Sequence, residues 1–163
     1  MVVHDERRLP NLARVVASFA RLPHAQYLGM RCDEIGPQRA SLSVPYHQRL
    51  IGNPRTGVLH GGVITAVLDT VGWLAIAALL PEETAIATLD LRIDYLRPAQ
   101  PGQTIRATAQ CTKITTSVAF ARGVAYHESV DNPIAQLSGT YMLGSTGFTA
   151  DQGGGSRDGA QPC

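Results

Sequence analysis

The feature that most constrains this fold is a long, almost uninterrupted apolar segment in the middle of the chain. Residues 63–80, VITAVLDTVGWLAIAALL, contain few polar side chains, namely Thr65, Asp69 and Thr70. With Gly61 at its start and Pro81 at its end, the segment predicts a helix over about 61–80. A helix that is apolar on nearly every side must be covered on most of them. The rest of the chain therefore has to wrap around it.

The same segment approaches the length of a membrane span, which is about 20 residues. Asp69 near its middle would cost about 2.5–3.5 kcal/mol on insertion scales. No second apolar run of this length follows, and the residues after it alternate as soluble strands do. These observations favour a covered helix in a soluble protein over a transmembrane helix.

Segments with strand-like alternation lie on both sides of the apolar helix. We predict strands at residues 28–36, 38–46, 88–96, 103–114, 118–127 and 134–143. In 88–96, strict alternation puts Leu89 and Tyr95 on an apolar face and Thr88 on a polar face. One face of 118–127 consists of small residues, which would allow a helix to approach closely: Ala119, Ala121, Gly123 and Ala125.

A short amphipathic helix at about 11–22 precedes the first predicted strand. The order is then helix, two strands, long helix and four strands at meander spacing, which predicts an α+β fold: an antiparallel sheet curled around one helix. Residues 1–143 have the length of a single domain. The Gly-rich residues 144–163 predict a disordered tail.

Composition excludes several classes of function. The net charge of +1 gives no general attraction to nucleic acid or to anionic membranes. The three cysteines, Cys32, Cys111 and Cys163, are too few and too widely spaced for a disulfide framework. The sparse cysteines and the lack of an apolar signal core at the N-terminus together predict a cytoplasmic protein. The histidines show no metal-ligand spacing, so we predict no metal site and read those at positions 4, 24, 47 and 127 as surface or loop residues.

Asp69 can be interpreted in two ways. Aspartate is a poor helix former and is rarely buried without a partner. It can lie on the one solvated stripe of the helix, beside Thr65 and Thr70, or it can be a reactive carboxylate in apolar surroundings. The pair Gly61-Gly62 is similarly ambiguous. Glycine can permit a tight turn, or it can bare helix N-terminal N–H groups that would stabilise an oxyanion.

The combination of these features is more specific. Three segments closely resemble the PaaI-like branch of the hotdog-fold thioesterases. They are the loop that ends in LHGG, the following VITAVLDT with its acid nine residues after the histidine, and the later DLRIDYLRPAQPG. The resemblance covers residues 28–143. It implies a hotdog fold, hydrolysis of acyl-CoA thioesters to free acid and CoA, and no metal or redox cofactor. It also implies a homodimer that often pairs again into a tetramer.

The resemblance also suggests roles for individual residues. Asp69 would attack the thioester carbonyl or activate a water, and the backbone amide of Gly62 would polarise that carbonyl. His60 would help to set the local geometry, and Asn53 matches an asparagine that is often implicated upstream of the motif. Thr88 would orient the water, although it could equally be an ordinary strand residue.

Further residues are candidates for binding the substrate. Gly61 lies directly beside the proposed carbonyl site. Arg97 and Arg122, together with Arg106 and Lys113, could contact the phosphates of coenzyme A, because Arg and Lys provide such contacts. The alternative is that most of these basic side chains only solvate one face of the sheet.

The spacing of the motif has a geometric consequence. Gly62 and Asp69 lie seven residues apart on one predicted helix, which separates them by roughly 10 Å along its axis. Both must approach one thioester carbon within about 3 Å. One subunit cannot do this with both of its own residues, so we predict a two-fold dimer in which Asp69 faces the helix N-terminus of the other chain.

Two other functions share this fold and stay open. The protein could bind acyl-CoA without catalysis, in which case Asp69 would be structural. It could also be an acyl-thioester dehydratase or hydratase. Those enzymes usually pair a catalytic histidine with an acid that is placed differently, and the sequence contains no such pairing.

Overall fold

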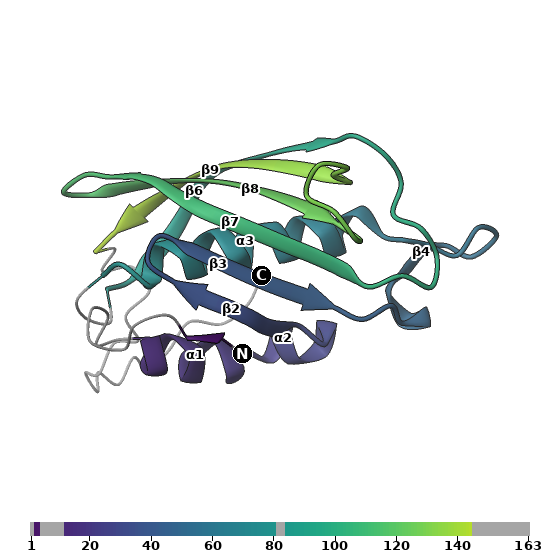
Figure 1. Ribbon diagram of the computed structural model, residues 1–163, viewed down its shortest axis with the longest axis horizontal. Helices are drawn as coiled ribbons and strands as arrows, with labels where there is room; N and C mark the ends of the chain where they lie inside the picture. Colours follow the sequence, from purple (N-terminus) through teal and green to yellow (C-terminus); the bar gives the residue numbers. More distant parts are fainter. Residues whose placement is uncertain (1, 4–11, 81–83, 145–163) are drawn as a thin grey trace, which may run out of the picture.

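The computed structural model of the protein describes residues 2–3, 12–80 and 84–144. The predicted tail at 144–163 therefore lies outside the described residues except for Gly144, and so do Pro81 and residue 11. The central element is α3 (Gly61–Ala77), around which one curved sheet wraps (Figure 1).

Within the described residues, seven strands form the main sheet in the order β1-β2-β3-β7-β8-β9-β6. Neighbouring strands are antiparallel, except that β1 runs parallel to β2. The strands are β1 (Val2–Val3), β2 (Arg31–Gly36), β3 (Arg39–Val44), β6 (Ile86–Tyr95), β7 (Ile105–Ile114), β8 (Val118–Tyr126) and β9 (Ala135–Leu143).

The sheet covers α3 through faces lined by small residues. The predicted inner face of β8 is confirmed, because Ala119, Ala121 and Ala125 are buried, and Ala107 on β7 is buried beside them. Most of α3 is buried, as its all-round apolar sequence predicted. The α+β class, with one long helix inside a curled antiparallel sheet, is therefore confirmed. The helix ends at Ala77, three residues earlier than predicted.

The strand order differs in one respect from a simple meander. β7, β8 and β9 follow one another, but β6 pairs with β9 at the far edge, while β7 pairs with β3. Alternation of apolar and polar residues specifies which side chains face the core, but it does not specify which strand is the neighbour. The sequence therefore gave no signal for the position of β6.

Two local regions have more structure than the sequence indicated. The predicted N-terminal helix is α1 (Leu12–Ala20), and a second helix, α2 (Pro23–Leu28), follows it. Pro23 suits a first helical position, and Gly29, with φ of 70°, ends the helix in the left-handed conformation. The polar loop before α3 contains a short 3-10 helix, η1 (Gln48–Leu50), and a hairpin of β4 (Ile51–Asn53) and β5 (Val58–Leu59).

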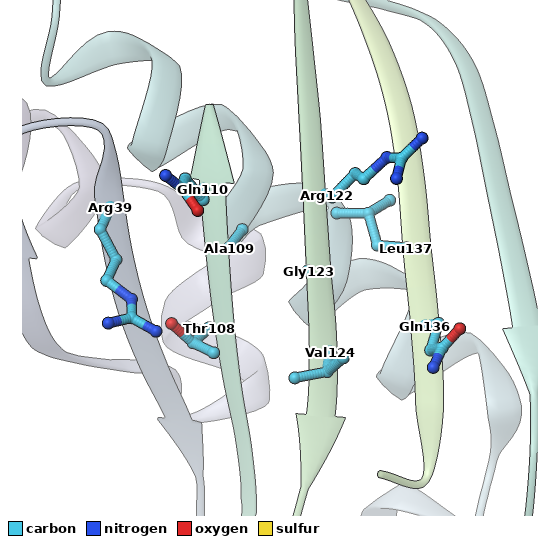
Figure 2. A pocket seen from close by; sticks show the side chains of 9 residues that line it. All are labelled: Arg39, Thr108, Ala109, Gln110, Arg122, Gly123, Val124, Gln136 and Leu137. Atoms are coloured by element: carbon cyan, nitrogen blue, oxygen red, sulfur yellow. The ribbon is translucent and has the colours of Figure 1, made fainter. Parts of the chain in front are cut away.

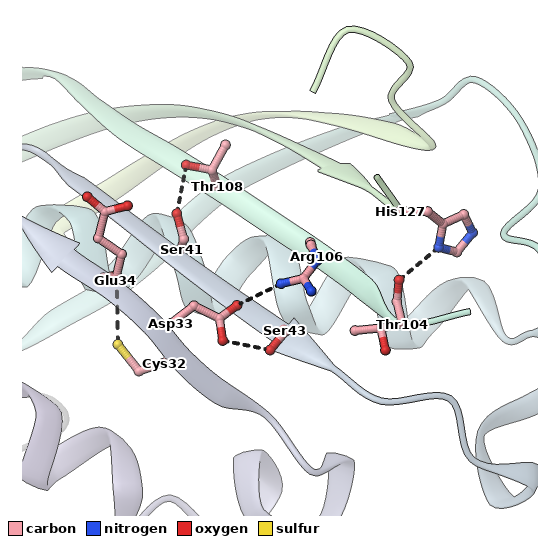
Figure 3. Close-up of polar contacts among 9 residues, drawn as sticks. All are labelled: Cys32, Asp33, Glu34, Ser41, Ser43, Thr104, Arg106, Thr108 and His127. Atoms are coloured by element: carbon pink, nitrogen blue, oxygen red, sulfur yellow. Dashed lines mark hydrogen bonds and ion pairs between the residues drawn. The ribbon is translucent and has the colours of Figure 1, made fainter. Parts of the chain in front are cut away.

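His127 lies in the loop after β8, as the sequence allowed, but it is buried and not on the surface. Its exposed fraction is 6%, and its Nε2 accepts a hydrogen bond from the Gln100 N–H at 2.9 Å. Its Nδ1 lies 2.8 Å from the carbonyl oxygen of Thr104 and must donate to it, because a carbonyl can only accept (Figure 3). The ring therefore ties the connection between β6 and β7 to the end of β8.

Replacing His127 with Ala is expected to lower the free energy of unfolding by about 1–3 kcal/mol, because a buried N–H and a carbonyl each lose their partner. Urea unfolding of the purified variant measures this. His24→Ala, at an exposed position in α2, is the matched control and should stay close to wild type. Equal stability of both variants would mean that water replaces the ring without cost.

Candidate active site

The N-terminus of α3 is capped by the side chain of His60. This residue has φ of −63° and ψ of 135°, just outside the helix, and its Nδ1 accepts the Gly62 N–H at 2.9 Å. The ring proton is therefore on Nε2. The Gly62 amide, which the sequence resemblance assigned to the thioester carbonyl, is already engaged within its own chain.

Gly61 carries the open donor at this helix end. Its N–H has no hydrogen-bond partner within residues 12–80 and 84–144. Its carbonyl accepts a hydrogen bond from the Tyr95 hydroxyl at 2.8 Å, and that hydroxyl is also 2.6 Å from Oγ1 of Thr65. Tyr95, which alternation assigned to the apolar face of its strand, therefore packs beside the helix start but is half exposed.

Asp69 lies on the stripe of α3 that the sheet leaves uncovered. The half-buried members of this stripe are Thr65, Ala66, Asp69, Thr70 and Trp73. Asp69 does not project freely into solvent, because its Oδ1 accepts a hydrogen bond of 2.9 Å from Oγ1 of Thr88. The structure thus brings together two of the site residues that the sequence suggested.

A β-bulge turns Thr88 toward the helix. Register against β9 shifts between Thr88, which is opposite Tyr141, and Asp90, which is opposite Thr140, so Leu89 is the extra residue. Leu89 is 55% exposed and not on the core face. The strict alternation predicted for this strand was therefore wrong at Thr88 and Leu89, because a bulge reverses the parity of the residues on one side of it.

Tyr141 is a neighbour of Asp69 that sequence reasoning missed. It is fully buried, and its hydroxyl donates to the backbone carbonyl of Asp69 at 3.4 Å. Burial first, then the negative charge of Asp69 and a hydrogen bond to its side chain, raise the pKa of the Tyr141 hydroxyl far above its ordinary value. This hydroxyl therefore stays protonated and serves as a donor.

Asn53 lies in the hairpin that packs on the capping residue. Its side-chain Oδ1 accepts the Arg55 N–H at 3.1 Å, and its carbonyl accepts the Gly57 N–H at 2.9 Å. A Cβ at Gly52 would lie 2.7 Å from Cα of His60, so the hairpin backbone presses directly on the cap. Asn53 is exposed and shapes its own turn within this chain.

The two candidate arginines lie in different places, and neither contacts Asp69. Nη2 of Arg97 donates to the Asn132 carbonyl at 2.6 Å beside a small cavity of about 180 Å³. Arg122 follows the inward-facing Ala121 and projects from the outer face of the sheet, at a shallow pocket that also includes Arg39 (Figure 2). On the same face, Arg106 lies 3.7 Å from the Asp33 carboxylate (Figure 3).

Two negative findings apply to the described part of the chain. None of its helices has both the length and the apolar character needed to cross a membrane. No three side chains of His, Cys, Asp or Glu come together there as a metal-binding group would require.

Comparison with known proteins identifies the family. Residues 56–133, which include His60, Asp69 and Thr88, match the family model of the thioesterase superfamily. The chain is 32% identical to YigI of Escherichia coli K12, a medium/long-chain acyl-CoA thioesterase, over 136 residues that cover 76% of this chain and 86% of YigI. The chain belongs to the thioesterase superfamily.

Solved structures support the same assignment. A thioesterase family protein from Silicibacter pomeroyi superposes with a TM-score of 0.73 at 31% identity, covering 81% of this chain and 97% of that one. The PaaI protein of E. coli superposes with a TM-score of 0.74, covering 83% of this chain and 95% of that one; at 19% identity it supports the fold alone. The predicted hotdog fold and the class of thioester hydrolase are confirmed.

The length of α3 keeps Gly61 away from Asp69 of the same chain. Gly61 and Asp69 are eight residues apart on the continuous helix α3, so roughly 12 Å separates them along its axis. An oxyanion donor and an attacking group must both lie within about 3 Å of one thioester group. The open Gly61 amide and the Asp69 carboxylate of one chain are therefore too far apart to act on the same thioester group.

Proposed function

We propose that this protein hydrolyses acyl-CoA thioesters, with Asp69 as the nucleophile or the general base. The observation that carries the proposal is the half-buried Asp69 carboxylate, held by Thr88 at 2.9 Å on the open stripe of α3. A carboxylate oriented in this way can attack a carbonyl or take a proton from water. The similarity to YigI, named as an acyl-CoA thioesterase, supports coenzyme A as the thiol.

Either role of Asp69 gives the same products. As a nucleophile, the carboxylate forms a mixed anhydride and expels the coenzyme A thiolate, and water then cleaves the anhydride. As a base, it removes a proton from the water that attacks the thioester, and the thiolate again leaves. Both routes pass through a negatively charged carbonyl oxygen, which requires a hydrogen-bond donor.

We assign that donor to Gly61 in place of Gly62. The Gly62 N–H is bonded to His60, whereas the Gly61 N–H is open and lies at the positive end of the α3 dipole. In this proposal His60 acts indirectly, because it fixes the first turn of α3 and leaves one amide unpaired. Asn53 acts through the hairpin that supports His60.

Gly61→Pro tests this assignment, because it removes the N–H at a position where proline fits. Gly61 is the first helical residue, and His60 before it already has the extended ψ that proline demands. We expect kcat to fall about 10²–10³-fold, as on loss of other oxyanion donors, with a nearly unchanged melting temperature. Gly61→Ala keeps the N–H and is the control. If Gly61→Pro stays within a few-fold of wild type, the donor lies elsewhere.

The proposal includes a two-fold dimer in which each site takes Asp69 from one chain and Gly61 from the other. β6 is an edge strand within the described sheet and would offer its unpaired backbone groups to a partner. Tyr95 on this strand is 51% exposed and contacts Thr65 on the open stripe of α3, and Leu89 is 55% exposed, so β6 carries uncovered apolar surface. A second copy of the chain would cover both features.

Release of free thiol from a panel of acyl-CoAs tests the function directly. Aliphatic chains from short to long, together with aromatic acyl groups, should include at least one substrate that is turned over catalytically. Binding of acyl-CoA without thiol release would instead make the protein a non-catalytic ligand-binding module. Loss of affinity for coenzyme A in Arg97→Gln or Arg122→Gln would assign either residue to the phosphates.

A further inference from the structure

The hydroxyl of Tyr141 has no part in the chemistry proposed so far. The side chain is inaccessible to solvent, and its hydroxyl bonds to the Asp69 carbonyl oxygen at 3.4 Å and also interacts with the Asp69 carboxylate. Burying a hydroxyl costs free energy that its hydrogen bonds must offset. Phenylalanine would fill nearly the same space without that cost, so packing alone does not account for a tyrosine here.

Two glycines make room for this side chain. A Cβ on Gly72, within α3, would overlap the Tyr141 hydroxyl oxygen and lie 3.1 Å from Cζ of the ring. A Cβ on Gly139, within β9, would lie 2.8 Å from a ring carbon. Glycine inside a helix costs about 1 kcal/mol relative to alanine. The helix that carries Asp69 thus accepts an unfavourable residue one turn further on, where the hydroxyl enters.

Tyr141 and Thr88 approach Asp69 as a pair. They lie directly opposite each other on β9 and β6, so their side chains leave the sheet on the same face, toward α3. Thr88 donates to the carboxylate of Asp69, and Tyr141 donates to its backbone carbonyl. Two adjacent strands therefore hold one residue at two points, on a helix stripe that is otherwise open.

We propose that Thr88 and Tyr141 form a two-point clamp that positions the Asp69 carboxylate for reaction. Tyr141 is a positioning residue in this clamp, because it is fully buried behind Asp69 and acts through that residue. The inference rests on the proposed role of Asp69. Its importance follows from geometry: a displacement of about 1 Å from the productive position can cost on the order of 10²-fold in rate.

Tyr141→Phe is the first test. We expect kcat to fall by roughly 10- to 100-fold through misplacement of the carboxylate, while KM stays nearly unchanged because the hydroxyl does not contact substrate. Tyr126→Phe makes the same chemical change on the neighbouring strand β8, where the hydroxyl has no hydrogen-bond partner in the described chain. This control should behave as wild type. An unchanged kcat for Tyr141→Phe, or a rise in KM alone, would overturn the clamp.

A double variant separates the hydrogen-bonding role of the Tyr141 hydroxyl from its role in filling space. In Gly72→Ala combined with Tyr141→Phe, the new methyl group takes most of the volume that the hydroxyl vacates, although it still lies 3.1 Å from the ring Cζ and 3.3 Å from Cδ2 of Leu137. The better helix former offsets this small adjustment, so we expect a melting temperature close to that of wild type while kcat stays low. Recovery of kcat to the wild-type value would show that Tyr141 acts only by filling space, and the clamp would be refuted.

The outcomes also distinguish this proposal from the one on which it rests. An inactive Asp69→Asn variant combined with normal kcat in Tyr141→Phe would refute the clamp and leave the role of Asp69 intact. An active Asp69→Asn variant would refute the role of Asp69 and the clamp together.

Discussion

Asp69→Asn is expected to lower kcat for acyl-CoA hydrolysis by about 10²–10⁴-fold, the range typical for removal of a positioned acid or base. The amide has the same shape as the carboxylate, and its oxygen can still accept the hydrogen bond from Thr88. It cannot attack a carbonyl efficiently or take a proton from water. The chemistry should therefore fail while the site stays assembled.

The measurement is thiol release by purified protein, together with the melting temperature and the oligomeric state. Asp90→Asn is the matched control, because Asp90 lies on the same strand as Thr88, is exposed, and its side chain has no hydrogen bond in the described chain. It should keep wild-type turnover. Near-normal hydrolysis by Asp69→Asn would exclude Asp69 from the chemistry.

The sequence predicted the parts of the fold that depend on periodicity. The apolar run after Gly61 forms the central helix, and the small residues on β8 and the neighbouring strand face it, because both patterns demand burial. The sequence could not predict that β6 lies beside β9. Strand pairing depends on the closure of distant segments, which no local pattern in this chain specifies.

The site was predicted less completely, and each difference has a local cause. A bulge at Leu89 reverses the alternation and brings Thr88 to Asp69. Histidine is not among the preferred N-cap residues, so the sequence did not indicate that His60 would occupy the Gly62 amide.

For Tyr141 the sequence did contain a usable signal. Gly139 stands inside an otherwise regular strand, and Gly72 stands inside an apolar helix. A glycine in either setting often marks the close approach of another group. Together they point to a bulky side chain between the two elements, and Tyr141 is the group that the structure places there.

A second large change in activity is expected from an experiment that tests which chain supplies each half of the site. Because Gly61 and Asp69 are roughly 12 Å apart along α3, we expect each site to take one residue from each chain. Asp69→Asn and Gly61→Pro should each inactivate the homodimer. Their mixed dimer should differ from both, since its two sites do not receive the lesions equally.

The mixed dimer is prepared by unfolding and refolding the two variants together and isolating it with two different tags. One of its sites then contains both substitutions, and the other contains neither. Activity should return to about half that of wild type per dimer, because one of two equivalent sites is intact. If both residues instead served the site of their own chain, every site would carry one lesion and no activity would return. Wild-type chains with the same tags, refolded in parallel, control for losses during refolding.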